Sequence, residues 1–314
     1  MSPKRKTKID LVIPVFNEAG VVEQTHARIC EFINPLPYQF AFYYVDDGSR
    51  DGTADSLRAI SDSDPRVSLL TLSRNFGHQA ALTAGLDAVQ GDFMISLDAD
   101  GQHPPEMIGQ MIELFEQGYD IVQAQRVNDA RAFSFKQMTS SAFYKLLNRI
   151  SGTRIAPGAA DFRGMSRQAV EALKSMPEYH RFLRGMVSWI GFKSVILPYH
   201  ESSRVAGRSK YSFGKMFRLA SDAIFSFSLI PLYIGLSAGG MFFCLAALEM
   251  VYVLSFWIQG DTSNLAPGWS SLMFVILIAS GMLMILLGFI GIYVGYIFQE
   301  VKKRPIYVLK KREE

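Results

Sequence analysis

The sequence predicts a doubly wound α/β domain of the Rossmann type, followed by an amphipathic helix and two transmembrane helices. Apolar runs rich in β-forming residues alternate with helical patterns in the N-terminal part of the chain. Acidic residues follow two of the predicted strands, and two long apolar segments lie near the C-terminus. Of the 314 residues, 49% are hydrophobic and 19% are charged, which excludes a disordered, collagen-like or coiled-coil protein.

The predicted strands and helices follow one another in regular order. We expect strands near Ile9–Val15, Phe40–Val45, Val67–Leu72, Phe93–Leu97 and Ile121–Ala124. We expect helices near Ala19–Ile33, Thr53–Ser61, Gly77–Val89 and Pro104–Glu116. This alternation predicts a parallel sheet that binds its ligand at the carboxyl ends of the strands. The sequence has no G-x-G-x-x-G or Walker A motif, so a bound nucleotide would be held in another way.

Two apolar segments are each long enough to cross a membrane, for which about 20 residues are needed. Leu229–Ile258 contains one charged residue, Glu249, and Trp269–Phe298 contains none. The connecting loop Gln259–Gly268 has no Lys or Arg, whereas basic residues flank the outer ends of the pair. Since basic flanks stay in the cytoplasm, we expect a multi-pass protein with two spans and both termini cytoplasmic.

The segment Tyr211–Phe227 has apolar residues at helical spacing and cations on another face. This pattern is typical of a helix in the membrane interface that meets anionic lipid, although a helix packed on the α/β domain remains an alternative. The start of the chain, Met1–Lys8, is basic, but Pro14 interrupts the short apolar stretch after it. We therefore expect no signal peptide and a cytoplasmic N-terminal domain.

Other features limit the partners of the protein. Cys30 and Cys244 cannot form a disulfide framework, and they favour a reducing, cytosol-facing location. The net charge of +3 is too small to indicate a nucleic-acid partner. Small residues in the spans would allow close helix packing, and we expect a homo-oligomer. They are Gly235, Gly239, Gly288, Gly291 and Gly295.

Pairs of carboxylates follow two predicted strands. Asp46 and Asp47 end the second strand, and Asp98 and Asp100 follow the fourth. A doubly wound sheet places its ligand at such strand ends. Carboxylate oxygens are the ligands that Mg²⁺ and Mn²⁺ prefer, so the pair Asp98 and Asp100 indicates a site for one of these ions.

Four motifs, taken in order, resemble those of family 2 glycosyltransferases with the GT-A fold. They are Val12–Glu18, Asp46–Thr53, Ser73–Gly77 and Asp98–Glu106. Further matches cover nearly the whole chain, at Asp161–Arg163, Arg181–Gly185, Arg204–Tyr211 and Lys303–Pro305. More narrowly, the chain resembles the polyprenyl-phosphate glycosyltransferases, which include dolichyl-phosphate mannosyltransferases and bactoprenol glucosyltransferases of the GtrB type.

The resemblance implies four parts of the chain and an activity. The parts are a GT-A domain (1–203), an acceptor loop with the interfacial helix (204–228), a two-helix transmembrane region (229–298) and a basic cytoplasmic tail (299–314). The activity is transfer of a single sugar, glucose from UDP-glucose, to polyprenyl (undecaprenyl) phosphate at the cytoplasmic face of the membrane, with inversion. A mannosyltransferase that uses GDP-mannose remains an alternative. A processive polysaccharide synthase or a non-catalytic nucleotide-sugar-binding membrane module is less favoured.

The resemblance also implies roles for individual residues. Asp98 and Asp161 would be catalytic. The donor would be bound by Pro14, Phe16, Glu18, Asp46, Asp47, Asp98, Ala99, Asp100, Gln102, Arg204 and Lys210. The acceptor phosphate would be bound by Arg126, Arg131 and Arg163. Mg²⁺ or Mn²⁺ would be held by Asp98, Asp100 and Gln102.

Asp161 follows a turn rich in Gly and Ala, and the resemblance places it across the site from Asp98, near the acceptor phosphate. A phosphate monoester has its second pKa at about 6, so the acceptor needs little deprotonation. We therefore predict that Asp161 chiefly orients the acceptor, and proton removal is the alternative. Three positions depart from the commonest pattern of the family, namely Gly101, Ala160 and Arg208. Of these, Arg208 would alter the contact between the loop that closes over the donor and the donor itself.

Overall fold

The computed structural model describes residues 7–127, 159–200, 230–259 and 268–310. The chain divides into two compact units. The α/β unit comprises Met1–Phe217 with Arg304–Glu314, and the helical unit comprises Arg218–Lys303. The expected acceptor loop and interfacial helix, 204–228, lie outside the described residues.

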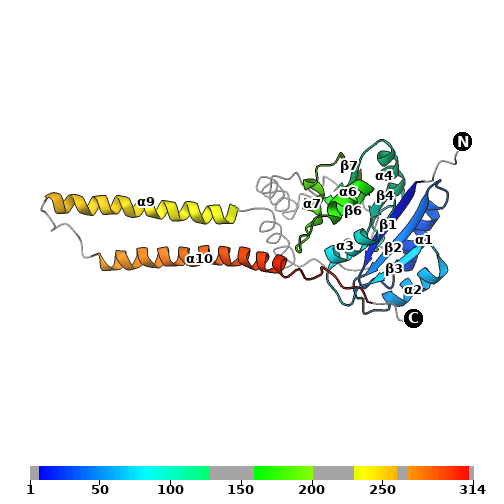
Figure 1. Ribbon diagram of the computed structural model, residues 1–314, viewed down its shortest axis with the longest axis horizontal. Helices are drawn as coiled ribbons and strands as arrows, with labels where there is room; N and C mark the ends of the chain where they lie inside the picture. The colour runs from blue at the N-terminus through cyan, green and yellow to red at the C-terminus, as the bar shows by residue number, and fades with distance from the viewer. Residues whose placement is uncertain (1–6, 128–158, 201–229, 260–267, 311–314) are drawn as a thin grey trace. The chain divides into compact units, whose positions relative to one another are not determined.

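The described part of the α/β unit contains a seven-stranded sheet in the order β3-β2-β1-β4-β6-β5-β7 (Figure 1). The strands are β1 Lys8–Val15, β2 Gln39–Asp46, β3 Val67–Thr71, β4 Phe93–Ser96, β5 Ile121–Arg126, β6 Ala159–Ser166 and β7 Ser194–Tyr199. Strands β3, β2, β1 and β4 pair in parallel, as do β5 and β7. Strand β6 runs antiparallel to both β4 and β5. The sheet is therefore mixed, and the prediction of a parallel sheet is wrong at β6.

Helices cover both faces of this sheet (Figure 1). The helices are α1 Val22–Ile33, α2 Thr53–Ser63, α3 His78–Ala88, α4 Glu106–Glu116, α6 Arg167–Lys174 and α7 Leu183–Trp189. One core cluster joins α1, α2 and α4 to the face of β1 that carries Ile9, Leu11 and Ile13. A second cluster on the opposite face joins α3, through Ala81 and Ala84, to Val45 and Leu72. The architecture is thus a three-layer α/β/α arrangement.

The first five strands and first four helices lie where the sequence predicts them, within a few residues. Each of these helices except α3 has a clear apolar stripe, as in α1, where Val22, Thr25, Ile29 and Ile33 are buried. Helix α3 instead approaches the sheet closely because its buried face is made of small residues. A Cβ atom at Gly85 would clash with the Val12 side chain, so only glycine permits this approach.

The segment after the helical unit pairs with the edge of the sheet. Leu309 forms an antiparallel bridge with Leu72, just beyond β3. The Ser73 N–H donates to the Val308 carbonyl at 2.8 Å, and the Lys310 N–H donates to the Thr71 carbonyl at 2.7 Å. Because β3 is an edge strand, this segment covers backbone groups that would otherwise lack strand partners.

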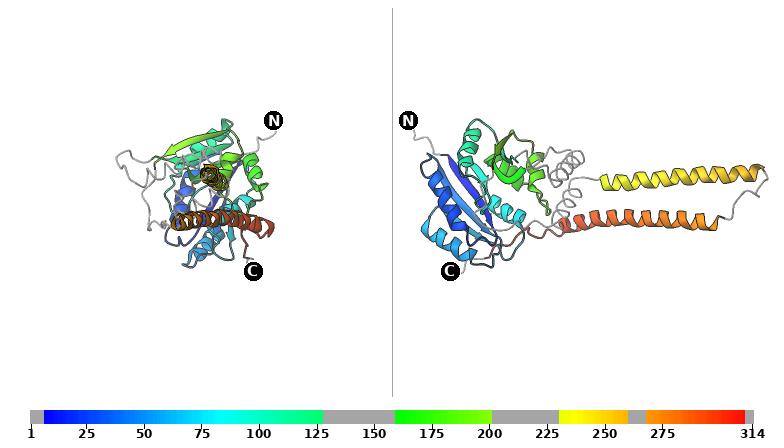
Figure 2. Two further views of the ribbon diagram at one scale, coloured as in Figure 1. Left: turned by 90° about the vertical axis from the view of Figure 1, so that its left-hand side faces the viewer. Right: turned by 180° about the vertical axis from the view of Figure 1, so that it is seen from behind.

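The helical unit contains α9, Ile230–Gln259, and α10, Trp269–Val301, which run side by side (Figure 1 and Figure 2). Gly235 of α9 lies directly against Leu286 of α10, so one of the predicted small residues does permit close packing. Among the described residues, the stretch Ile278–Val301 is long and apolar enough to cross a membrane, and Gly235–Leu245 is a shorter apolar stretch. The span expected at Leu229–Ile258, which corresponds to α9, therefore stays a prediction.

Candidate active site

The loops after β1 and β2 are joined at the carboxyl edge of the sheet. The Asn17 N–H donates to Ser49 Oγ at 3.0 Å, and the Arg50 N–H donates to Asn17 Oδ1 at 2.9 Å. The Glu18 N–H donates to Thr53 Oγ1 at 2.9 Å. These contacts join the loops after β1 and β2, and the loop after β4 reaches the same edge because β4 pairs with β1 in parallel. The expected donor residues Pro14, Phe16 and Glu18 come from this edge; Pro14 is buried, and the other two are partly exposed.

The two aspartates at the end of β2 are buried, and their carboxylates accept hydrogen bonds from backbone N–H groups. Asp46 is 1% exposed and accepts the Ser49 N–H at 3.0 Å. Asp47 is 3% exposed and accepts the Phe76 and Gly77 N–H groups at 2.7 and 2.9 Å. Burial raises the pKa of Asp47, although these two hydrogen bonds oppose the shift. Asp47 thereby fixes the loop that leads into α3.

The loop after β4 is anchored on α1 and presents oxygen atoms at the sheet edge. Thr25 Oγ1 donates to the Ala99 carbonyl at 3.0 Å, and Arg28 Nη1 donates to the Gly101 carbonyl at 3.3 Å. The side chain of Asp98 is 39% exposed. Asp100 and Gln102 are also partly exposed, whereas Ala99 is buried. The carboxylate and amide oxygens of Asp98, Asp100 and Gln102 fit the ligand preference of Mg²⁺ or Mn²⁺.

Two histidines flank Asp98. His103 Nδ1 accepts the backbone N–H of Asp98 at 3.0 Å, and His103 Nε2 lies 3.7 Å from Asp98 Oδ2. The His103 ring is stacked on Phe162 of β6 with ring centroids 4.3 Å apart, which fixes its orientation. On the other side, His78 Nε2 lies 3.9 Å from Asp98 Oδ1. The exposed carboxylate is therefore held between two imidazoles.

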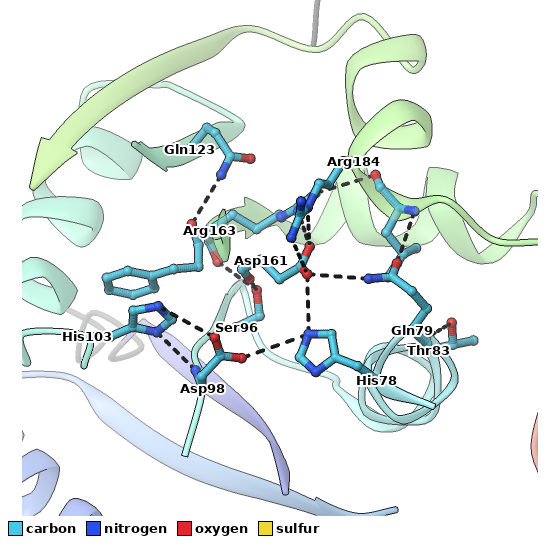
Figure 3. A network of polar contacts seen from close by, with 12 residues as sticks. His78, Gln79, Thr83, Ser96, Asp98, His103, Gln123, Asp161, Arg163 and Arg184 are labelled. Carbon is cyan, nitrogen blue, oxygen red and sulfur yellow. Dashed lines mark hydrogen bonds and ion pairs between the residues drawn. The ribbon is translucent and has the colours of Figure 1, made fainter. Parts of the chain in front are cut away.

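Asp161 lies at the centre of a dense polar network (Figure 3). Because β6 runs antiparallel to β4, the start of β6 meets the end of β4 and brings Asp161 close to Asp98. Asp161 Oδ1 accepts from Arg163 Nη2 at 2.8 Å and from Arg184 Nε at 3.2 Å. Asp161 Oδ2 accepts from Arg184 Nη2 at 3.0 Å and lies 3.3 Å from His78 Nε2. His78 thus bridges Asp161 and Asp98.

The same contacts set the protonation states of Asp161 and His78. Burial alone would raise the pKa of Asp161, but Arg184, the hydrogen bond with His78, and Arg163 together hold it well below its ordinary value. Burial alone would lower the pKa of His78, but the hydrogen bond with Asp161 and the charges of Asp98 and Asp161 raise it. The carboxylate of Asp161 is consequently ionised at neutral pH, and both of its oxygens are engaged.

The three arginines expected at the acceptor phosphate differ in position. Arg163 is 3% exposed and lines an apolar interior pocket with Met94, Met165 and Leu173. It is therefore a buried ion-pair partner of Asp161. Arg126 is exposed at the end of β5. Other expected or remarked residues, Arg131, Arg204, Arg208 and Lys210, lie outside the described residues.

Four residues of this network were not predicted from the sequence, namely His78, Gln79, His103 and Arg184. His78 and Gln79 directly follow the Ser73–Gly77 motif, and His103 lies within Asp98–Glu106. Arg184 belongs to the Arg181–Gly185 motif. All four are polar residues inside or beside the motifs, which was the sequence signal for them. Their partners come from distant segments of the chain, so their contacts could not be predicted.

One further group of side chains has metal-ligand character. Among the described residues, ligand atoms of His26, Cys30 and Asp64 lie within 4.8 Å of one another. However, Arg66 Nη2 lies 2.6 Å from Asp64 Oδ2 and 3.3 Å from Cys30 Sγ. A guanidinium cation therefore already pairs with this group, in which His26 and Cys30 belong to α1 and Asp64 lies between the end of α2 and the start of β3, away from the carboxyl edge of the sheet.

Comparison with known proteins matches residues 10–174 to Glycosyl transferase family 2. The chain is 39% identical to the uncharacterized glycosyltransferase YkcC of Bacillus subtilis, over 98% of this chain and 94% of that protein. It is 39% identical to the bactoprenol glucosyl transferase of Shigella phage SfII, over 97% of this chain and 98% of the relative. The corresponding protein of Shigella phage SfX is 38% identical, with coverage of 98% and 100%.

The solved structures that match the chain are more distant in sequence. The mannosyl-3-phosphoglycerate synthase from Rubrobacter xylanophilus is 18% identical, with a TM-score of 0.48 over 69% of this chain and 72% of that one. The glucosyl-3-phosphoglycerate synthase from Mycobacterium tuberculosis, in complex with Mn²⁺, UDP-glucose and phosphoglyceric acid, is 17% identical, with a TM-score of 0.46 over 70% and 78%.

Proposed function

Because the chain belongs to glycosyl transferase family 2, we propose that it transfers a single glucose from UDP-glucose to polyprenyl phosphate at the cytoplasmic face of a membrane. The observation that carries this proposal is its identity of 38 to 39% with bactoprenol glucosyl transferases over nearly the full length of both chains. The carboxyl edge of the sheet, with Asp98 and Asp161 beside each other, supplies a polar site consistent with this chemistry.

The reaction exchanges one bond at the anomeric carbon of the sugar. A phosphate oxygen of the acceptor forms a bond to this carbon while the bond to the UDP oxygen breaks, and the leaving UDP takes the electron pair. Attack from the opposite side inverts the configuration. The acceptor phosphate is already ionised near neutral pH, so no proton has to be removed from it in this step.

Asp98, Asp100 and Gln102 would hold Mg²⁺ or Mn²⁺ together with the donor diphosphate. When bound, such an ion supplies positive charge that offsets the charge developing on the leaving diphosphate. The protein positions these ligands by tying the Asp98–Gln102 loop to α1 and by holding Asp98 between His78 and His103. The expected donor contacts of Arg204 and Lys210, and the acceptor contacts of Arg126 and Arg131, belong to the same proposal.

We further propose two spans, with both termini in the cytoplasm, and association of the helices into a homo-oligomer. The topology is supported by the absence of Lys and Arg from Gln259–Gly268 and by the basic residues outside the pair of helices. In intact cells, a cysteine introduced into this loop should react with an impermeant thiol reagent, whereas one placed at Lys310 should not. Reaction at Lys310 alone would exclude this topology.

The transfer activity is tested with purified full-length protein in lipid nanodiscs. UDP-glucose or GDP-mannose is supplied with undecaprenyl phosphate, and the lipid product is identified by its mass. We expect a hexosyl product with UDP-glucose that is lost in excess chelator. Product from GDP-mannose alone would identify the mannosyltransferase alternative. Donor binding without turnover would identify a non-catalytic module.

A further inference from the structure

Arg184 is the outer of the two guanidinium groups that hold Asp161. The exposed fraction of the side chain rises from 3% in Arg163 through 7% in Asp161 and 19% in Arg184 to 41% in His78. Arg163 is thus the most buried cation of the network, whereas Arg184 and His78 are the more exposed ones. They contact Asp161 from opposite sides, and His78 also contacts Asp98 (Figure 3).

The backbone that carries Arg184 is fixed from two sides. The Leu183 N–H donates to Gln79 Oε1 at 3.2 Å, and Arg163 Nη1 donates to the Leu183 carbonyl at 3.4 Å. Gln79 also donates from Nε2 to Asp161 Oδ2 at 3.4 Å. Two segments that are far apart in sequence, α3 and β6, thus contact the start of α7, and they set the position of the Arg184 Cα.

The guanidinium of Arg184 is oriented as well as positioned. Its Nε and Nη2 atoms donate to the two different oxygens of Asp161, which is the planar two-point contact that fixes an arginine side chain in one rotamer. The carboxylate is in turn held by Arg163, and Ser96 Oγ donates to the Asp161 carbonyl at 2.5 Å. An arginine side chain held at this many points loses little further freedom when it binds a second anion.

We propose that Arg184 binds the acceptor phosphate, and that Asp161 acts as the positioning residue that holds Arg184 in place for this contact rather than as a proton acceptor. This inference rests on the proposed function, because it names the residue of that site that meets the second anion. The reaction brings an anionic acceptor next to a diphosphate, and an arginine has the geometry to hold two phosphate oxygens at once. Arg163, the expected acceptor residue of β6, is too deeply buried to do so.

Arg184 and Asp98 belong to the same polar network. His78 Nε2 lies 3.3 Å from Asp161 and 3.9 Å from Asp98, so one imidazole separates the Arg184–Asp161 pair from the carboxylate expected at the donor diphosphate. An anion bound on Arg184 would therefore be held in the same site as the donor, as the attacking phosphate must be. Both carboxylate oxygens of Asp161 already accept hydrogen bonds, so its role in this arrangement is to position Arg184 and His78.

The test compares Arg184→Gln and Arg184→Lys with the wild type in nanodiscs, with UDP-glucose as donor and undecaprenyl phosphate as acceptor. We expect Arg184→Gln to raise the KM for the acceptor about 10- to 100-fold, the size of effect given by loss of a hydrogen bond to a charged group. The dissociation constant of UDP-glucose, measured by calorimetry without acceptor, should change less than twofold. Arg184→Lys should recover part of the loss, because it keeps the charge without the two-point geometry.

Arg167→Gln is the matched control, since Arg167 is exposed on α6 and its guanidinium donates to the Gln90 carbonyl at 3.3 Å. It should behave as the wild type. An unchanged acceptor KM in both Arg184 variants would overturn the inference. Equal losses of donor and acceptor binding, accompanied by a lower melting temperature, would also overturn it by assigning Arg184 a purely structural role. Failure of the wild type to transfer sugar would instead overturn the proposed function.

Discussion

Arg163 Nη2 lies 2.8 Å from Asp161 Oδ1, and both side chains are almost fully buried in β6, two residues apart. Both side chains lie on the same face of the strand, because residues i and i+2 do so. A buried guanidinium is tolerated only when it is paired, so each residue depends on the other. A single ion pair consequently links the interior of the sheet to the site at its edge.

Asp161→Asn should destabilise the protein strongly. The substitution keeps the size of the side chain but leaves Arg163 buried without its counter-ion, a change that typically costs about 3 to 5 kcal/mol of unfolding free energy. Urea denaturation followed by fluorescence measures the loss. Asp55→Asn is the matched control, because Asp55 pairs with Arg58 at 2.7 Å but is 79% exposed. The control should change stability by less than about 0.5 kcal/mol, and equal effects of the two substitutions would contradict the interpretation.

The contribution of Asp161 should also depend on pH. Its pKa in the folded protein lies well below the ordinary 3.8, so the unfolded state binds a proton that the folded state does not when the pH lies between the two values. The stabilisation is therefore complete above about pH 4 and is lost as the pH falls toward the folded pKa. Measured between pH 5 and pH 2.5, the stability gap between wild type and Asp161→Asn should narrow as the pH falls. A constant gap would show that Asp161 does not titrate differently on unfolding.

Local sequence pattern was sufficient for the first half of the α/β unit. Strand β1, for example, is a run of apolar β-forming residues between polar flanks. Strand β2, which pairs with it, shows the same pattern. Strand β6 was missed because it contains Asp161, Arg163 and Gly164, which are unusual in a buried strand. Their burial is offset by contacts with Arg184 and by the close approach of Phe93 to Gly164, neither of which a local pattern contains.

In the candidate site, too, the residues that follow a predicted strand were predictable, whereas contacts between distant segments were not. Asp98 and Asp100 stand out because carboxylates directly follow a predicted strand, and the structure gives Asp98 the exposed position that this implies. The pairing of His78, Asp161 and Arg184 could not be predicted, since it joins three segments separated by 83 and 23 residues in sequence. Asp46 and Asp47 were predicted to bind the donor, which stays a prediction, and the structure adds that both accept hydrogen bonds from loop backbone.

Asp100→Ala should remove turnover without unfolding the protein. Asp100 is partly exposed at the sheet edge, where its Oδ1 accepts the Gln102 N–H at 3.1 Å, so the substitution leaves the buried core unchanged. If Asp100 helps to hold the divalent ion, the rate should fall at least about 100-fold, and donor binding should no longer respond to Mn²⁺. Calorimetry with and without Mn²⁺ measures the second effect. Full activity of this variant, or of the wild type in excess chelator, would reject a metal at this position.

The C-terminal segment is tied to α3 and to the sheet through Tyr307. Its hydroxyl donates to Asp87 Oδ2 of α3 at 2.9 Å, and its ring packs against the cluster of Val45 and Leu72. Burial and the charge of Asp87 raise the pKa of Tyr307 to about 12, so the phenol remains a donor at neutral pH. The adjacent Val308 carbonyl accepts the N–H of Ser73, where the Ser73–Gly77 loop begins.

Deletion of residues 305–314 should therefore weaken both folding and donor binding. It uncovers the edge of β3, removes the bridge between Leu72 and Leu309, and frees the start of the loop that Asp47 holds at Phe76. We expect a lower melting temperature and weaker binding of UDP-glucose, measured by thermal scanning and calorimetry. Tyr307→Phe removes only the hydrogen bond to Asp87, so it should cost about 1 kcal/mol and leave donor affinity nearly unchanged. If the deletion lowered stability no more than Tyr307→Phe does, the pairing of this segment with β3 would contribute nothing to the fold.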